Sequence, residues 1–227
     1  MGHPSSFVRN ALIDTATLAT FMVVVLGLFI VPGPAVLLVL TRTAQGGRPV
    51  GIATGAGIAT GDLVHTLLAA VGLSALLMTS SLAFSVVKLC GAGYLLWLGV
   101  RALLEKPAAV RAEAAPTPGV SAISPRRAFW QAVPAELLNP KTALFFLAFL
   151  PQFVDPARGG VAFQIAFLGL LLALMGLMSD GLYALAAGSA GRWLKRNGSV
   201  LRWERYVTGG VFIGLGVTAV FAGGGRK

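Results

Sequence analysis

The sequence predicts an all-α integral membrane protein of about six transmembrane helices. Of its 227 residues, 56% are hydrophobic and only 11% are charged, whereas a soluble domain carries roughly 25% charged residues. The apolar residues form blocks of about 20 residues or more, which is the length that a helix needs to cross a bilayer. Lipid is therefore the expected surrounding of most side chains, and anionic lipid rather than nucleic acid is the expected partner of the net charge of +10.

The apolar blocks give the expected order of the membrane spans, which lie near residues 17–40, 52–78, 82–104, 129–150, 161–188 and 206–223. A segment rich in proline, alanine and charge, 105–128, is predicted to be an exposed cytoplasmic linker. This linker divides the chain into two three-helix repeats, at 1–104 and 129–227, and the first of them carries a short N-terminal extension at 1–16.

The basic residues predict the orientation of these spans. Twelve lysines and arginines lie at the ends that follow the first, third and fifth spans, whereas four lie at the opposite ends. An excess of basic residues marks the cytoplasmic side, so both termini are expected outside. Three spans in each half then run in opposite directions, which is the geometry of an inverted 3+3 repeat.

Two pairs of segments support this repeat. GYLLWLGVRAL in the third span aligns without gaps on GVFIGLGVTAV in the sixth, at an offset of 117 residues. DLVHTLLA, which starts at Asp62, aligns on DGLYALAA, which starts at Asp180, at an offset of 118 residues. Each half therefore carries one aspartate in its middle span, with His65 and Tyr183 at equivalent positions.

The first and fourth spans are interrupted by prolines. Pro32 and Pro34 flank Gly33 and remove two backbone donors within three residues. Asn139-Pro140 offers the same interruption in the second half. A proline can simply kink a membrane helix, but paired breaks favour a broken-helix site, in which backbone carbonyls and dipoles bind a solute or an ion.

Asp62 and Asp180 are the candidate chemical residues, because a carboxylate at mid-span costs roughly 2.5–3.5 kcal/mol even on a lenient insertion scale. We expect them to bind substrate or exchange protons, and the alternative is a carboxyl group buried for packing. His65 and Tyr183 each follow an aspartate by one turn and could orient it or share its proton, although a purely structural histidine is an equal alternative. Lys141, after the second break, could offset a substrate carboxylate or extend to the interface.

Several function classes lack the motifs that they need. The sequence contains no P-loop and neither HExxH nor GxSxG, so ATP-driven pumping and hydrolysis have no evident machinery. The single cysteine, Cys90, excludes an intramolecular disulfide and a cysteine-based zinc cluster. We expect no catalytic residues, no cofactor and no metal site.

Three motifs in order resemble the lysine-exporter superfamily of bacterial translocators: the PGP of the first span, the glycine-rich second span that ends at Asp62, and the NPK that is followed by PQF at 151–153. The resemblance runs from about residue 20 to about 222 and is closest to the homoserine/threonine-resistance branch. It implies a multi-pass protein of the bacterial cytoplasmic membrane. It also implies export of amino acids or close derivatives, neutral and similar to homoserine or threonine, driven by the proton gradient or the membrane potential.

The expected mechanism is alternating access, in which two inverted halves move around a site near the midplane. Two alternatives stay open. The chain could export a metal cation or another small solute, since carboxylates and carbonyls also suit a hard cation. It could also be a membrane scaffold that transports nothing and whose aspartates contact a basic residue of a partner. A homodimer is a further possibility, although no face of the sequence marks an interface.

Overall fold

The computed structural model describes residues 13–30, 34–104, 123–196 and 198–224, and all regular elements in this part of the chain are helices. The α-helices are α2 (Thr15–Ile30), α3 (Pro34–Gly46), α4 (Arg48–Thr79), α5 (Ser81–Leu104), α6 (Pro125–Leu137), α7 (Pro140–Phe149), α8 (Val161–Arg196) and α9 (Gly198–Gly224). Two 3-10 turns, η1 (Leu150–Phe153) and η2 (Pro156–Arg158), connect α7 to α8. The predicted all-α class is confirmed.

Three helices are each long and apolar enough to cross a membrane: α4, α5 and the Val161–Ala187 part of α8. The α6–α7 segment is a fourth candidate, which is bent by 60° at a break. The apolar segments of α2 and α9 are shorter. The multi-pass membrane prediction is confirmed, whereas the number of six spans stays a prediction.

Short connections fix the first half of the chain. Gly47 adopts a left-handed conformation, with φ of 81°, between α3 and α4, and Pro49 follows in the first turn of α4. Ser80 separates α4 from α5 and caps both of them. Its N–H donates to the carbonyl of Leu76 at 2.9 Å, and its hydroxyl accepts from the N–H of Ala83 at 3.1 Å.

The second half begins at α6, which starts at Pro125 inside the segment predicted as a linker. The hydroxyl of Ser124 accepts from the N–H of Arg127 at 3.3 Å and so caps this helix. The helix then runs along α4. Residues 105–122 of the predicted linker lie outside the described residues.

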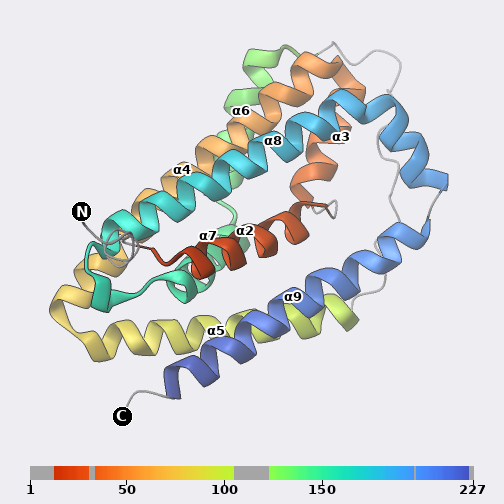
Figure 1. Ribbon diagram of the computed structural model, residues 1–227. Coiled ribbons are helices and arrows are strands. Elements are labelled where there is room, and N and C mark those ends of the chain that lie inside the picture. Colours follow the sequence, from red (N-terminus) through yellow and green to blue (C-terminus); the bar gives the residue numbers. More distant parts are fainter. Residues whose placement is uncertain (1–12, 31–33, 105–122, 197, 225–227) are drawn as a thin grey trace, which may run out of the picture.

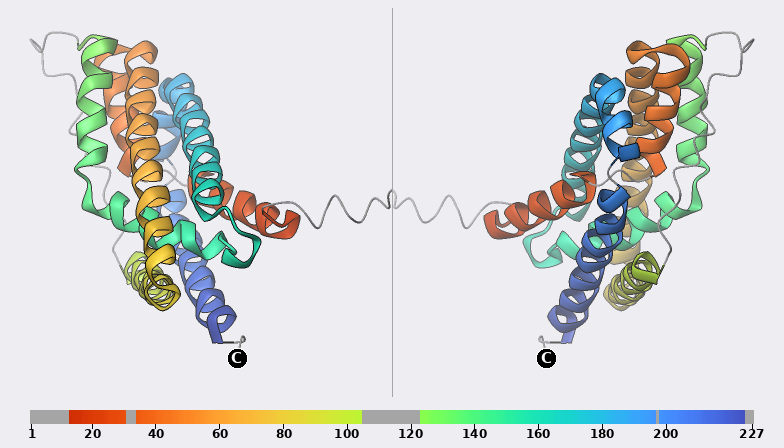
Figure 2. Two further views of the ribbon diagram at one scale, coloured as in Figure 1. Left: turned by 90° about the vertical axis from the view of Figure 1, so that its left-hand side faces the viewer. Right: turned by 90° about the vertical axis from the view of Figure 1, so that its right-hand side faces the viewer.

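The long helices form two layers (Figure 1). α4 and α8 lie side by side in one layer, with α6 against α4, while α5 and α9 pack together in the other layer. The short helices α2 and α7 lie between the two layers, as the views of Figure 2 also show. α2 contacts α8 and α9, and α7 contacts α4 and α5. Each of these short helices therefore packs on long helices of the other half of the chain.

Small residues bring α4 and α8 into close antiparallel contact. A Cβ added at Gly51 would lie 3.0 Å from the Cβ of Ala184, and one added at Gly169 would lie 2.8 Å from the Cβ of Thr66. The two contacts are equivalent when 118 is added to the residue numbers of α4, because Gly51 then corresponds to Gly169 and Thr66 to Ala184. This offset is the one that aligns the two aspartates in the sequence.

The contact between α5 and α9 has the same reciprocity. A Cβ at Gly99 would lie 2.7 Å from Ile213 and 2.8 Å from the carbonyl oxygen of Gly209. A Cβ at Gly216 would lie 2.5 Å from Leu96 and 2.9 Å from the carbonyl oxygen of Ala92. The two sets of contacts are equivalent when 117 is added to the residue numbers of α5. Glycine at both places allows the two helices to approach closely.

Candidate functional site

Asp62 lies near the centre of α4 and is buried, with 8% of its surface exposed. Its backbone carbonyl accepts the hydroxyl of Thr66 at 2.8 Å. The predicted neighbour His65 is also buried, one turn further along the same helix. Asp62 and His65 therefore both lie in the interior on α4, and a shared role for them stays a prediction.

His65 binds the break of the second half rather than Asp62. Its Nε2 lies 3.2 Å from the backbone oxygen of Glu136, in the last turn of α6. A carbonyl oxygen only accepts, so Nε2 carries the proton of this hydrogen bond. The imidazole also packs on the ring of Phe146 in α7, with the ring centroids 5.7 Å apart. His65 thus contacts the helices on both sides of the break.

The break itself is two residues long. Leu138 and Asn139 lie outside the helices, between the end of α6 and the start of α7 at Pro140. The N–H of Asn139 donates to the carbonyl of Glu136 at 3.1 Å, and the carbonyl of Asn139 accepts from Ala143 at 3.1 Å. The predicted interruption at Asn139 and Pro140 is therefore a true break with a 60° bend.

Glu136 is a functional candidate that the sequence-based prediction left out of the site. It is half-buried against α4: a Cβ added at Gly61 would lie 2.7 Å from the Cβ of Glu136. The available signal was its place three residues before the Asn139-Pro140 break.

Asp180 lies in α8 with 5% of its surface exposed. A Cβ added at Gly55 would lie 2.8 Å from the Cβ of Asp180, so this aspartate is level with Gly55 on α4. Asp62 lies seven residues further along α4, which is about 10 Å. Tyr183 follows Asp180 by one turn and is half-buried.

The region of Asp180 adjoins the first broken helix. The hydroxyl of Ser179 donates to the carbonyl of Phe29, next to the end of α2, at 3.2 Å. A Cβ at Gly176 would lie 3.2 Å from the ring of Phe29. The middle helix of each half thus binds the other half's broken helix where that helix ends: α4 through His65 and α8 through Ser179.

Three carboxylates form one electrostatic group. Asp62 interacts with Glu136 and Asp180, and Asp180 also interacts with Glu136. Among the described side chains, no lysine or arginine pairs with any of the three. Within the same part of the chain, no three His, Cys, Asp or Glu side chains converge in a group that could hold a metal ion.

Some predicted site residues cannot be placed in this arrangement. Pro32 and Gly33 lie outside the described residues. Pro34 begins α3 and Pro140 begins α7, but their side chains and that of Lys141 lie outside the described part of the chain. Roles for these residues stay predictions.

The family model of the LysE type translocators matches residues 26–223. The chain belongs to the LysE type translocator family. A homoserine/homoserine lactone efflux protein of Salmonella typhimurium is 32% identical over 72% of this chain and 77% of its own length. A leucine efflux protein of Klebsiella pneumoniae is 32% identical over 86% of this chain and 91% of its own. An uncharacterized membrane protein of Pseudomonas aeruginosa is 30% identical over 87% and 92%, respectively.

Membership of the LysE type translocators confirms the predicted family and the predicted place in the membrane. It also assigns the chain to proteins that move a solute. No solved structure gives a significant match.

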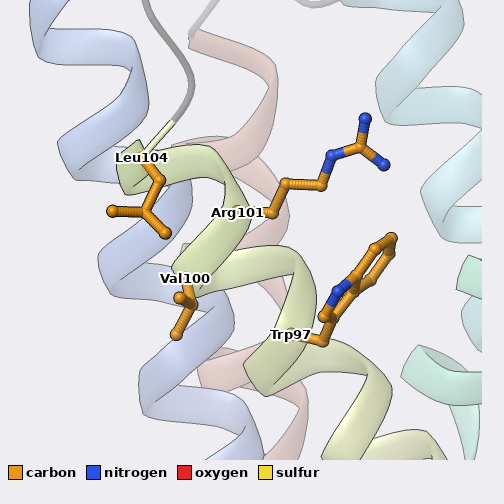
Figure 3. A pocket seen from close by; sticks show the side chains of 4 residues that line it. All are labelled: Trp97, Val100, Arg101 and Leu104. Carbon is orange, nitrogen blue, oxygen red and sulfur yellow. The ribbon is translucent and has the colours of Figure 1, made fainter.

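Two cavities in this translocator lie away from Asp62 and Asp180. One, of about 290 Å³, lies on the surface of α5 and is lined by Trp97, Val100, Arg101 and Leu104 (Figure 3). The guanidinium of Arg101 lies 5.3 Å from the centroid of the Trp97 ring. An arginine beside a half-exposed tryptophan is typical of a helix end at the membrane interface. The second cavity, of about 180 Å³, lies at the start of α2 and beside η2.

Proposed function

We propose that this chain exports neutral amino acids across the cytoplasmic membrane by alternating access between two inverted halves. The observation that carries the proposal is the reciprocal contact at the two breaks. The helix that holds Asp62 binds the α6–α7 break through His65, and the helix that holds Asp180 binds the end of α2 through Ser179. A movement of either broken helix would therefore shift the helix that carries the aspartate of the other half.

The reciprocal glycine contacts support the inverted repeat. Contacts between α4 and α8 exchange at the offset of 118, and those between α5 and α9 exchange at 117. Two helix pairs with the same symmetry are expected when each half is a copy of the other in the opposite orientation. Inverted halves can exchange their conformations, and this exchange is the basis of alternating access.

The chemistry of the site suits an amino acid. Asp62, Glu136 and Asp180 form a group that no described cation neutralises, so a mobile cation such as the ammonium group of a substrate is the expected counter-charge. The start of α7 at the break offers backbone N–H groups to a substrate carboxylate. Two relatives, an efflux protein for homoserine and homoserine lactone and one for leucine, support a substrate of this size class.

The same carboxylates give a route for coupling to protons. An ionised carboxylate inside the membrane is costly, and a proton can replace the substrate ammonium as its counter-charge. Binding of an ammonium then releases protons. An exchange of protons for substrate would link export to the proton gradient.

Packed phenylalanines support a closed outer path. The rings of Phe21, Phe149 and Phe153 lie with their centroids 5.0–5.7 Å apart, and all three side chains are buried. They lie beyond Phe146, toward the connection predicted to be outside. A substrate that leaves the Asp62 region in this direction would have to part these rings, so we assign the conformation to a state closed at the outer face.

The test is efflux of radiolabelled homoserine, leucine and other amino acids from preloaded proteoliposomes, with and without an imposed proton gradient. We expect saturable efflux by the wild type and none by Asp62→Asn or Asp180→Asn. Glu113→Gln, in the predicted linker, is the matched control and should export normally. Wild-type efflux by folded Asp62→Asn would refute the proposed site, and absence of efflux for every amino acid would favour another solute or a scaffold.

A further inference from the structure

We propose that the cavity between the start of α2 and the η1–α8 connection binds the zwitterionic head group of an amino acid at the outer face. The inference rests on the proposed function for its orientation and substrate class. The cavity measures about 180 Å³, which is the share of about six water molecules. This space can hold the head group and a short side chain of an amino acid.

Opposite charges stand around this cavity. Arg158 lies between two carboxylates, with its Nη2 3.8 Å from Oδ1 of Asp14 and its Nε 3.5 Å from Oδ2 of Asp155. Both distances exceed those of a close charge-assisted hydrogen bond. All three side chains are partly exposed, and ion pairs with such exposure contribute little to stability. A ligand with matching charges can therefore replace them.

Rigid surroundings hold these charges in place. The Oδ2 of Asp14 accepts from the N–H of Ala16 at 3.1 Å and so caps α2. Behind Asp155 lies Gln164, which has no exposed surface. Its Nε2 donates to the carbonyls of Asp155 and Gly159 at 3.0 and 2.6 Å, and its Oε1 accepts from the N–H of Asp155 at 3.0 Å. The loop that carries Arg158 is thereby fixed on α8.

The arrangement selects a zwitterion. Two carboxylates, of Asp14 and Asp155, can bind an ammonium group, and the guanidinium of Arg158 can bind a carboxylate. A ligand with only a positive charge would meet Arg158, and one with only a negative charge would meet the aspartates. Ile13 and Phe153 supply an apolar wall for the side chain. An amino acid with a short apolar side chain matches all these groups.

Occupancy would have a mechanical consequence. Arg158 and Asp14 join the η2 turn to the start of α2. A zwitterion that takes over both charges removes this direct link. The site would then be an exit site, whose filling removes this ion pair between α2 and η2 while Phe21 still packs on Phe153.

Cysteine protection tests the site from one side of the membrane. The single native cysteine, Cys90, is replaced by alanine, and Thr17, which lines the cavity, is replaced by cysteine. Intact cells then receive a membrane-impermeant thiol reagent from outside. We expect external leucine to slow the labelling of the new cysteine. Leucinamide, which lacks the carboxylate, and 4-methylpentanoate, which lacks the ammonium group, should not slow it.

Two variants locate the effect. Arg158→Gln should raise the leucine concentration for half-protection about 10- to 100-fold, as expected for the loss of a hydrogen bond to a charged group. Arg126→Gln, an exposed arginine at the start of α6, is the control and should change nothing. No protection by leucine, or equal protection by leucinamide, would overturn the site. Labelling that occurs only from the cytoplasmic side would overturn it as well.

The Asp62→Asn variant separates this inference from the proposed function. Protection that persists in this variant, when its efflux is lost, means that leucine occupies the outer cavity itself. Protection that disappears with efflux would mean that the label reports a distant conformational change, and the outer site would be rejected. Wild-type efflux without any protection would reject the outer site alone, while protection without efflux would reject the exporter.

Discussion

Replacing Gly61 by alanine should disconnect His65 from the α6–α7 break. The added Cβ would lie 2.7 Å from the Cβ of Glu136, at least about 0.7 Å closer than ordinary carbon contacts allow. If α6 moves away by this amount, the 3.2 Å hydrogen bond from His65 to Glu136 lengthens to about 3.9 Å, which is no longer a hydrogen bond.

The stability of Gly61→Ala should change much less than its transport. Tight packing costs about 1–3 kcal/mol, and alanine regains about 1 kcal/mol over glycine within a helix. Thermal unfolding in detergent and efflux from proteoliposomes measure the two effects on the same preparation. Gly72→Ala is the control on α4, because a Cβ there meets nothing within 4 Å.

A double variant identifies the cause. If Gly61→Ala acts through His65, it should reduce efflux no further in a His65→Leu background. Efflux of folded Gly61→Ala at the rate of Gly72→Ala would refute the reasoning, because the contact between α4 and α6 would then have no bearing on transport.

Further predictions concern the helix contacts and the fixed outer loop. Gly99→Ala and Gly216→Ala should lower the thermal stability by similar amounts, since their contacts are reciprocal, whereas Gly214→Ala, with open space around it, should not; unequal losses in unfolding scans would count against the symmetry. His65→Gln, whose amide can still donate to the Glu136 carbonyl, should retain more efflux than His65→Leu, and equal efflux would contradict a role of this hydrogen bond. Gln164→Leu should destabilise the protein by roughly 1–3 kcal/mol, because it leaves the buried groups of the loop unpaired; an unchanged unfolding temperature would show that water satisfies them.

The helices and the second break were predictable because their signals are local. Apolar length alone placed α4 and α5 within a few residues of their observed bounds. Asn139-Pro140 marked the end of one helix and the start of the next, since proline lacks a donor and restricts the residue before it. Asp62 stood out because a carboxylate inside an apolar block needs a reason.

The place of Glu136 beside α4 was not predictable, because it depends on a contact between residues that are distant in sequence. Only the approach of α6 to Gly61 shows that this side chain faces the interior. The sequence left a role at Asp62 and a structural role equally open for His65, and its hydrogen bond goes to a backbone carbonyl of the other half. Spacing along one helix cannot reveal such a partner. The outer cavity was not predicted for the same reason, because Asp14 and Arg158 are far apart in sequence.

The unequal lengths of the long helices relate the protein to the thickness of its bilayer. With 32 residues, α4 is about 48 Å long, and α5, with 24 residues, is about 36 Å long. A hydrocarbon core of about 30 Å can hold α4 only if it tilts or protrudes, and α5 needs a smaller tilt. A thinner membrane would tilt the layer of α4 and α8 more than the layer of α5 and α9, and the two layers would rotate relative to each other. Lipid chain length thus becomes a variable that can bias the conformation.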